Sequence, residues 1–189
     1  MQLSPPNITY SSLLLVAGTA CLFVAVAILQ SRRNAVGATS LILLLLALAW
    51  WDTTYAIFWA GTPGLTKYFW LDITYLGAVS VPTALFVFSM QITNHQGWLK
   101  RPFVSLLYLE PILVLTCLFT DAYHGLFFAG RRAENSAVIL DAGPVFWLNV
   151  VYSYSLILIA TILIVRGYLR SSGVYRRQLG VILLGIGFT

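Results

Sequence analysis

The sequence predicts an all-α membrane protein, a polytopic helix bundle with its N-terminus outside. Of the 189 residues, 59% are hydrophobic and only 9% are charged, whereas soluble domains carry about 25% charged residues. The mean hydropathy is +0.85. Apolar stretches of about 18 to 24 residues recur along the chain, which is the length that a helix needs to cross a bilayer. We therefore expect residues 1–189 to form a single transmembrane domain in contact with lipid.

Five complete spans and the start of a sixth are predicted. Turn signals separate the apolar stretches, such as GTPG after the second and TNHQG after the third. The sixth stretch follows YRRQ, but its residues rise only about 16 Å, half a bilayer. We therefore expect it to be truncated and the protein to continue. The expected spans are residues 12–29, 38–60, 69–92, 103–120, 145–165 and 179–189.

The basic residues predict the orientation of the bundle. Eight of the eleven Lys and Arg residues fall in the loops at 31–37, 94–102 and 166–178, and three fall on the other side. By the positive-inside rule these loops are cytoplasmic. Lys67 and Lys100 are both expected in loops, so a retinal-type Schiff base in mid-helix is not expected. Because the basic residues are dispersed among short loops, nucleic acid is not an expected partner.

One connection, the outer loop at residues 121–144, is long enough to have structure of its own. It carries DAYHGLFFAGRR and then AVIL between turn signals, a pattern typical of a short strand or hairpin arm. It is too hydrophobic for a free linker. We expect it to lie as a lid over the outer ends of the helices.

Two spans contain residues that shape a helix. Gly77 would let a partner helix approach closely, and Pro82 would free a carbonyl and allow a bend. Glu110 and Pro111 are expected to interrupt the fourth span, where the acid can form a hydrogen bond near the broken turn. We predict structural or switching roles for all four residues.

Polar and aromatic side chains recur on the outer halves of three spans. Tyr55 and Trp59 share a helix face with Asp52, since steps of three and four residues stay on one side. Asp72 and Tyr75 repeat this spacing in the third span, and Asn149 and Tyr152 repeat it in the fifth. Acids are costly in a bilayer and should face the bundle interior. We therefore predict an outward-facing ligand pocket with aromatic walls, the alternatives being interface anchors and hydrogen bonds between helices. The candidate residues are Trp51, Asp52, Tyr55, Trp59, Asp72, Tyr75, His124, Asn149 and Tyr152.

No motif predicts catalysis. The sequence lacks GxSxG, HExxH and a glycine-rich phosphate loop. His95 and His124 are predicted on opposite sides of the membrane, so they cannot share a metal or a haem. Cys21 and Cys117 lie in apolar runs as small hydrophobic residues. We expect no catalytic residue, metal or cofactor, and no enzyme activity of this chain; His124 is either a loop residue or a ligand- or proton-sensing one.

Three stretches resemble a known family. They are FWLDITYLGAVSVPTALFVFSMQIT, LLYLEPILVLTCLFTDAYHGLFF and GPVFWLNVVYSYSLILIATILIVRGYLRSSGVYRRQLGVILLG. Together with an uncharged first helix, they are similar to the N-terminal seven-transmembrane sensor region of bacterial histidine kinases, which also precedes some diguanylate cyclases. The resemblance implies a seventh helix, a cytoplasmic output domain, a homodimer and the bacterial cytoplasmic (inner) membrane.

The resemblance predicts a sensory input domain in which a small-molecule ligand or the membrane state biases the helix arrangement. Two alternatives stay open. One is a non-catalytic structural subunit of a larger membrane complex. The other is a small transporter, which is less favoured because the two proline-containing spans show no internal repeat.

Overall fold

The computed structural model describes residues 7–31, 35–61, 65–95, 97, 99, 101–134, 137–171, 179–180 and 182–183. The all-α membrane class is confirmed, because five helical segments are long and apolar enough to cross a bilayer. The predicted sixth span lies largely outside the described residues. The elements are α1 (Ile8–Ser31), α2 (Ala38–Ala60), α3 (Leu65–Ala78), α4 (Ser80–Ile92), α5 (Arg101–Phe119), α6 (Asp121–His124), β1 (Phe128–Glu134), β2 (Ala137–Ala142) and α7 (Pro144–Arg170).

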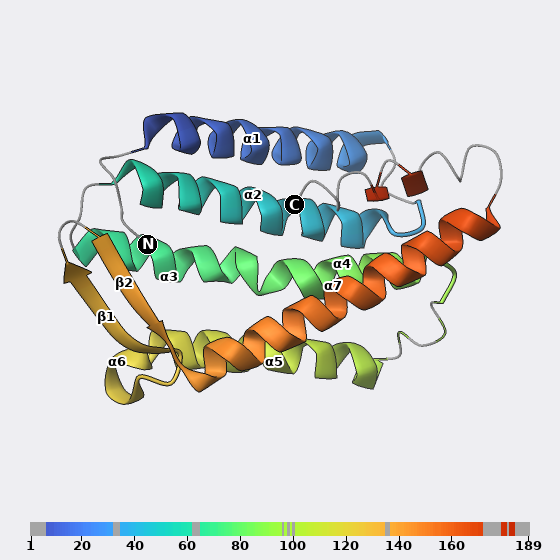
Figure 1. Ribbon diagram of the computed structural model, residues 1–189. Coiled ribbons are helices and arrows are strands. Elements are labelled where there is room, and N and C mark those ends of the chain that lie inside the picture. The colour runs from blue at the N-terminus through green and yellow to red at the C-terminus, as the bar shows by residue number, and fades with distance from the viewer. Residues whose placement is uncertain are drawn as a thin grey trace.

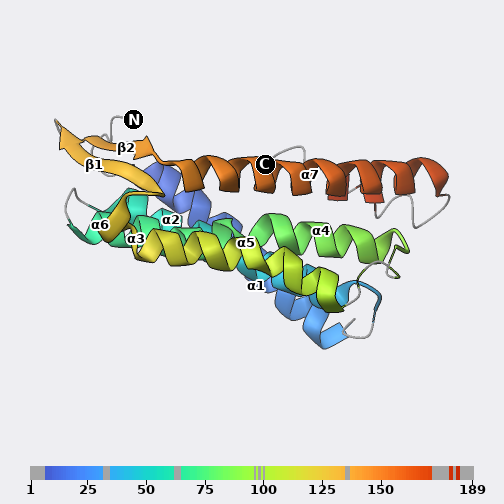
Figure 2. The ribbon, with the colours of Figure 1, turned by 90° about the horizontal axis from the view of Figure 1, so that it is seen from below.

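The helices form a layer that is crossed on one face by α7. In Figure 1, α1, α2 and the α3–α4 pair follow one another, and α5 lies beyond them. Helix α1 packs on α2, and α2 packs on α3, whereas α7 packs mainly on α4. Figure 2 shows α7 running along one side of the layer, with α4 next to it. The two strands and α6 cover one end of the bundle, which we call the hairpin end.

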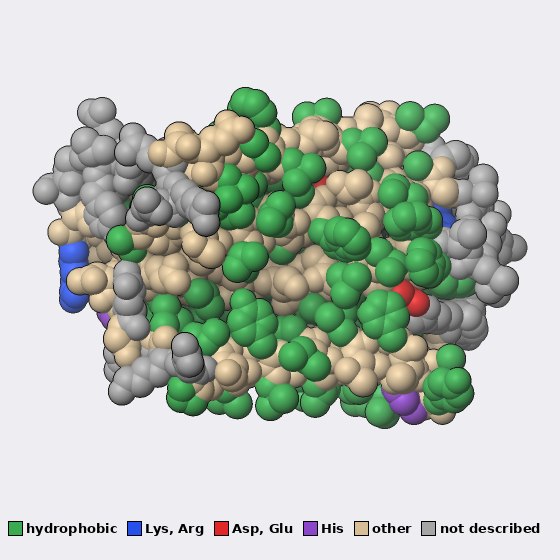
Figure 3. Space-filling view, turned by 180° about the vertical axis from the view of Figure 1, so that it is seen from behind, with side chains coloured by type: hydrophobic (Ala, Val, Ile, Leu, Met, Phe, Trp, Pro, Cys, Tyr) green, Lys and Arg blue, Asp and Glu red, His purple; other side chains and the backbone are tan. Residues whose placement is uncertain are grey.

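The outer surface of the bundle is apolar. Figure 3 shows hydrophobic side chains across the middle of one face, with Lys and Arg side chains only near its two ends. Helix α1 is the least buried of the five candidate spans, since only 11% of its apolar 18-residue stretch is buried. Lipid tails can cover such a surface at no hydrophobic cost. This arrangement fits a protein whose waist lies in hydrocarbon.

The close helix approach expected at Gly77 is present between α3 and α2. A Cβ at Gly77 would lie 2.7 Å from the Ala47 carbonyl oxygen and 2.8 Å from the Trp51 nitrogen. Only glycine therefore allows the two backbones to meet at this distance. One turn away, the Trp50 Nε1–H donates to the Ile73 carbonyl at 3.1 Å. The helix that approaches Gly77 closely is therefore α2.

The two intramembrane prolines have different effects. The predicted third span is divided at Val79, between α3 and α4, within one turn of Pro82, whose ring nitrogen cannot donate to the carbonyl four residues earlier. The expected interruption at Glu110 and Pro111 is wrong, because α5 continues through Pro111. The carbonyl of Leu107, which Pro111 leaves without a helical donor, accepts from the Tyr152 hydroxyl of α7 at 2.8 Å.

Lys67 was expected in a loop but lies in the first turn of α3. Its side chain is buried, and Nζ donates to the Gly61 carbonyl at 3.2 Å. Nζ also lies 5.0 Å from the centroid of the Phe58 ring, a geometry that attracts a cation to an aromatic face. Both contacts are near the hairpin end, where α2 ends.

The outer loop forms the short hairpin that the AVIL segment predicts. Strands β1 and β2 are antiparallel, with pairs running from Phe128 and Ala142 to Glu134 and Ala137, and an irregularity after Phe128. The preceding backbone joins the hairpin to α7, because Gly143 donates to the Phe127 carbonyl at 2.8 Å. A Cβ at Gly143 would overlap the Leu126 carbonyl. The loop therefore folds back over the helix ends.

Candidate functional site

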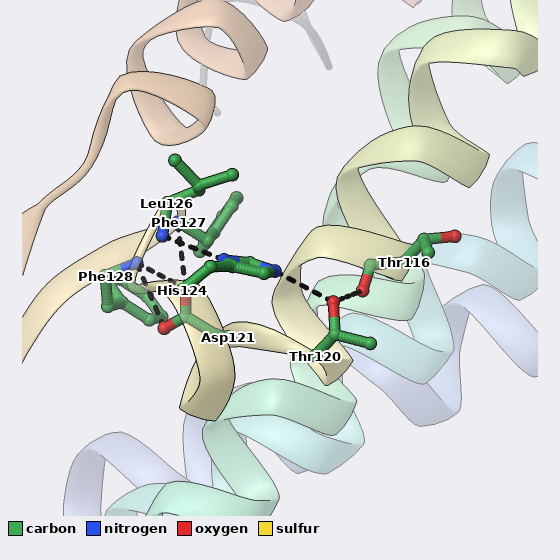
Figure 4. A network of polar contacts seen from close by, with 7 residues as sticks. All are labelled: Thr116, Thr120, Asp121, His124, Leu126, Phe127 and Phe128. Atoms are coloured by element: carbon green, nitrogen blue, oxygen red, sulfur yellow. Dashed lines mark hydrogen bonds and ion pairs between the residues drawn. The ribbon is translucent and has the colours of Figure 1, made fainter.

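The turn between α5 and β1 is built around a buried acid. Asp121 is only 7% exposed. Its Oδ1 accepts the Phe127 amide at 2.8 Å and the Phe128 amide at 3.2 Å (Figure 4). A carboxylate that satisfies two backbone donors fixes their position firmly, because charge-assisted hydrogen bonds are the stronger kind. Asp121 therefore sets where the two phenylalanines enter the bundle.

His124 extends this network back to α5. Its Nδ1 accepts the Leu126 amide at 3.1 Å, and its Nε2 lies 2.9 Å from the Thr120 hydroxyl (Figure 4). The Thr120 hydroxyl donates to the Thr116 carbonyl at 2.6 Å, so it accepts from Nε2–H. These partners select the neutral tautomer with its proton on Nε2. The Asp121 Oδ1 lies 3.9 Å from Nδ1 and would attract a protonated ring.

Aromatic rings fill the space beneath the turn. Phe127 is fully buried, and its ring centroid lies 4.8 Å from that of Phe128 and 5.0 Å from that of Tyr75 on α3. The ring of Phe146, in the first turn of α7, lies 5.7 Å from that of Phe127. Edge-to-face pairs at these distances add to the burial energy. Through Phe127, the turn contacts both α3 and α7.

A pocket of about 500 Å³ opens beside this turn, between α3, the end of α5, α6 and the start of β1. Its volume falls within the range of about 300–1,000 Å³ that holds small molecules. Two carboxyl groups, an imidazole and several aromatic rings line it, so it can offer both charge and apolar contact. The described lining residues are Asp72, Leu118, Phe119, Asp121, Ala122, Tyr123, His124, Gly125, Phe128 and Ala129.

The structure brings two of the nine candidate residues, Asp72 and His124, into this pocket. Tyr75 lies behind it, against Phe127 and Phe128. Tyr55 and Trp59 pack against the same hydrophobic cluster as Tyr75 and Phe127, on its side towards α1. There the Trp59 ring lies 5.3 Å from that of Tyr10, and the Tyr55 ring lies 5.5 Å from that of Phe58.

The other candidates lie deeper in the membrane. Asp52 is at the α1–α2 contact, with its Cβ 3.2 Å from where a Cβ on Gly18 would lie. Trp51 lies at the α2–α3 contact, directly against Gly77 of α3. The Asn149 Nδ2 donates to the Glu110 Oε1, in the middle of α5, at 3.0 Å. One turn further along α7, the Tyr152 hydroxyl donates to the Leu107 carbonyl. The candidates predicted to line one pocket therefore lie at several separate contacts in the bundle.

Sequence reasoning missed Asp121, which positions the turn. Its signal is present in TDAYHG, where an acid directly follows a helix and a glycine follows one turn later. Gly125 has a φ of +60°, which closes a turn that other residues rarely allow. Across the described ranges, no group of three or more His, Cys, Asp or Glu side chains is arranged to hold a metal ion.

Comparison with known proteins gives one match. No curated protein and no solved structure matches the chain. A family model, described as the N-terminal 7TM region of histidine kinase, matches residues 13–189. This range contains nearly all of the bundle and the whole hairpin end, and such a region is a non-catalytic sensor in the membrane. The chain therefore belongs to the family of N-terminal 7TM regions of histidine kinases.

Proposed function

We propose that this chain is the sensory input domain of a bacterial signal-transduction protein and lies in the cytoplasmic membrane. It receives an extracytoplasmic signal and passes it to a cytoplasmic output domain of the histidine kinase type. The observation that carries the proposal is the pocket at the hairpin end. Its walls come from separate elements, α3, α5, α6 and β1, so its shape depends on how these elements lie relative to one another.

A ligand in this pocket would contact the turn that positions Phe127. Asp121 and His124 line the pocket and also form the hydrogen bonds of the turn. A small displacement there would reach α3 and α7 through the rings of Tyr75 and Phe146. A ligand shifts such an equilibrium only by the difference in its affinity for the two arrangements. The pocket therefore offers a physical route from ligand to helix position.

The orientation supports an outer signal. The positive-inside rule places the hairpin end outside and the loops rich in Lys and Arg in the cytoplasm. Helix α7 starts beside the pocket and ends at Arg170, near the opposite end. It is the helix best placed to carry a change of tilt across the membrane.

The experiment fills the pocket without requiring the natural ligand. The full-length protein, with Cys21 and Cys117 replaced by alanine, receives Ala122→Cys, a position that is exposed and lines the pocket. Whole cells are treated with a bulky maleimide that cannot cross membranes. Autophosphorylation is then measured in membranes prepared from these cells. The matched control is Ala142→Cys, which is exposed at the end of β2 and is not among the pocket residues.

We expect both cysteines to be labelled from outside, and only labelling at position 122 to change autophosphorylation. Labelling at both positions with no change in activity would refute the pocket as the input site. Equal changes at both positions would show that any bulky group at this end disturbs the protein. Labelling only after the cells are opened would reverse the orientation and refute the extracytoplasmic signal.

A further inference from the structure

A second polar site lies inside the membrane, between α5 and α7. The Asn149 Nδ2 donates to the Glu110 Oε1 at 3.0 Å. One turn along, the Tyr152 hydroxyl donates to the Leu107 carbonyl at 2.8 Å. That carbonyl is available because Pro111 has no N–H to offer it. Two adjacent hydrogen bonds therefore join the middle of α5 to α7, in a part of the bundle separate from the pocket.

Only one of the two carboxyl oxygens of Glu110 has a hydrogen-bond partner among the described residues. Its Oε2 is buried and has no hydrogen-bond partner among the described residues. No ion pair involving Glu110 occurs in the part of the chain that the structure describes. Among the described residues, Tyr152 of α7 is a titratable side chain that interacts with Glu110, and it also interacts with the fully buried Thr83 of α4. No cation of the described residues lies within ion-pairing distance to balance a negative charge here.

The cost of such a charge decides the state of the group. An ionised carboxylate without a partner is far more expensive in an apolar medium than a neutral acid, and it neutralises if it can. Acids within membrane spans otherwise pair with a second group or face water. The neutral acid keeps a carbonyl oxygen that can accept from Asn149, so the observed hydrogen bond does not require the charge.

We propose that Glu110 is a proton-binding site, and that its bound proton keeps α5 on α7. On release, the carboxyl O–H bond breaks, the proton passes to water and the negative charge stays on Glu110. The carboxylate is then held in hydrocarbon with one oxygen bonded to Asn149 and the other buried without a partner, and moving towards water relieves this cost. Loss of the proton therefore separates the two helices at this level. The site is independent of the outer pocket and goes beyond the proposed function.

Infrared spectroscopy of the whole chain in lipid vesicles tests the bound proton. We expect a carboxylic acid C=O band at neutral pH that shifts in D₂O and is lost in Glu110→Gln. Asp141→Asn, at a half-buried position on β2, is the matched control and should keep the band. An unchanged acid band in a folded Glu110→Gln variant would overturn the proposal. If this variant does not fold, Glu110→Asp, which keeps a shortened acid, must shift the band, and an unshifted band refutes the site.

Spin-label distances test the consequence. Labels are placed at Leu109→Cys and Val151→Cys, whose side chains are 58% and 66% exposed on the two helices, with Cys21 and Cys117 replaced. Raising the pH above neutral should lengthen the distance in the otherwise wild-type chain and leave it constant in Glu110→Gln, which cannot ionise. Equal pH responses in both chains, or none in either, would refute the coupling between the proton and the helices. Neither measurement depends on a kinase output.

Discussion

Two helix contacts in this bundle are made in different ways. At Gly77, α3 lies directly on the backbone of α2. In contrast, α5 is joined to α7 by side-chain hydrogen bonds from Asn149 and Tyr152. The α3–α4 segment is also more deeply buried than α5: 61% of its apolar 18-residue stretch is buried, against 22% for α5. One contact lies at the centre of the bundle and the other lies near its lipid-facing side.

This difference between backbone packing and side-chain hydrogen bonds indicates which of the two helix contacts can open. Backbone packing at Gly77 depends on a close fit, and protein interiors do not deform continuously. Hydrogen bonds between helices in membranes are worth only about 0.6 kcal/mol on average, because other partners are available in the separated state. We therefore assign stability mainly to the α2–α3 contact and helix movement to the α5–α7 contact.

The largest expected effect is at Gly77. Gly77→Leu would force atoms into the Ala47 carbonyl and the Trp51 backbone, which cannot move aside as a flexible side chain could. We expect a loss of about 3 kcal/mol of unfolding free energy, the upper end of typical overpacking costs. The measurement is reversible unfolding in mixed detergent micelles. The matched control is Gly97→Leu, because a Cβ at Gly97 meets nothing within 4 Å. Equal losses in both variants would contradict a special role for the α2–α3 contact.

The next effect is expected at the Glu110 contact. Asn149→Leu keeps the branching and the number of heavy atoms of the side chain and removes the donor to Glu110. The expected loss is about 1–2 kcal/mol, near the upper limit for a hydrogen bond between membrane helices. The same unfolding measurement applies. Ser153→Ala is the control, since Ser153 lies at 3.5 Å from the Asn149 amide and is a weak partner at best. A larger loss in the serine variant would mean that the α5–α7 contact is organised differently.

The spans, the hairpin and the glycine contact could be predicted because each depends on local pattern. Length and hydropathy identify a span, turn residues bound a strand, and Gly77 in an apolar helix indicates close approach. Lys67 shows a limit of the same approach. A lysine after a GTPG turn indicates a loop, but the backbone carbonyl of Gly61 and the Phe58 ring allow it to lie inside the first turn of α3.

The partners of the polar side chains could not be predicted. Spacing places Asn149 and Tyr152 on one face of a helix, but it does not show which helix that face meets. Asp52 and Asn149 were expected at one depth, yet they face α1 and α5. Helix tilt and crossing decide this, and they depend on the packing of all the helices together. Asp121 was missed because its role depends on the path of the backbone beyond it.

A smaller effect tests the link between Pro111 and Tyr152. Tyr152→Phe removes the donor to the Leu107 carbonyl and should cost about 1 kcal/mol. In a Pro111→Ala background, the new amide at position 111 can donate to that carbonyl, so the same change should cost close to nothing. A double-mutant cycle on unfolding free energies measures this coupling. Equal costs in the two backgrounds would show that the Tyr152 hydroxyl does not replace the missing helical hydrogen bond.

The smallest effect is expected at the hairpin end, where side chains can meet water. Thr120 is exposed, and its hydroxyl lies 2.9 Å from the His124 Nε2. We expect Thr120→Val to cost about 0.5 kcal/mol or less, because water can take the place of the lost partner there, whereas no water is available in hydrocarbon for Tyr152. The unfolding measurement compares the two variants directly. A loss at Thr120 as large as that at Tyr152 would mean that the His124 network is as essential to the fold as the α5–α7 contact. The turn beside the pocket would then be a fixed part of the fold and could not respond to a ligand by small displacements.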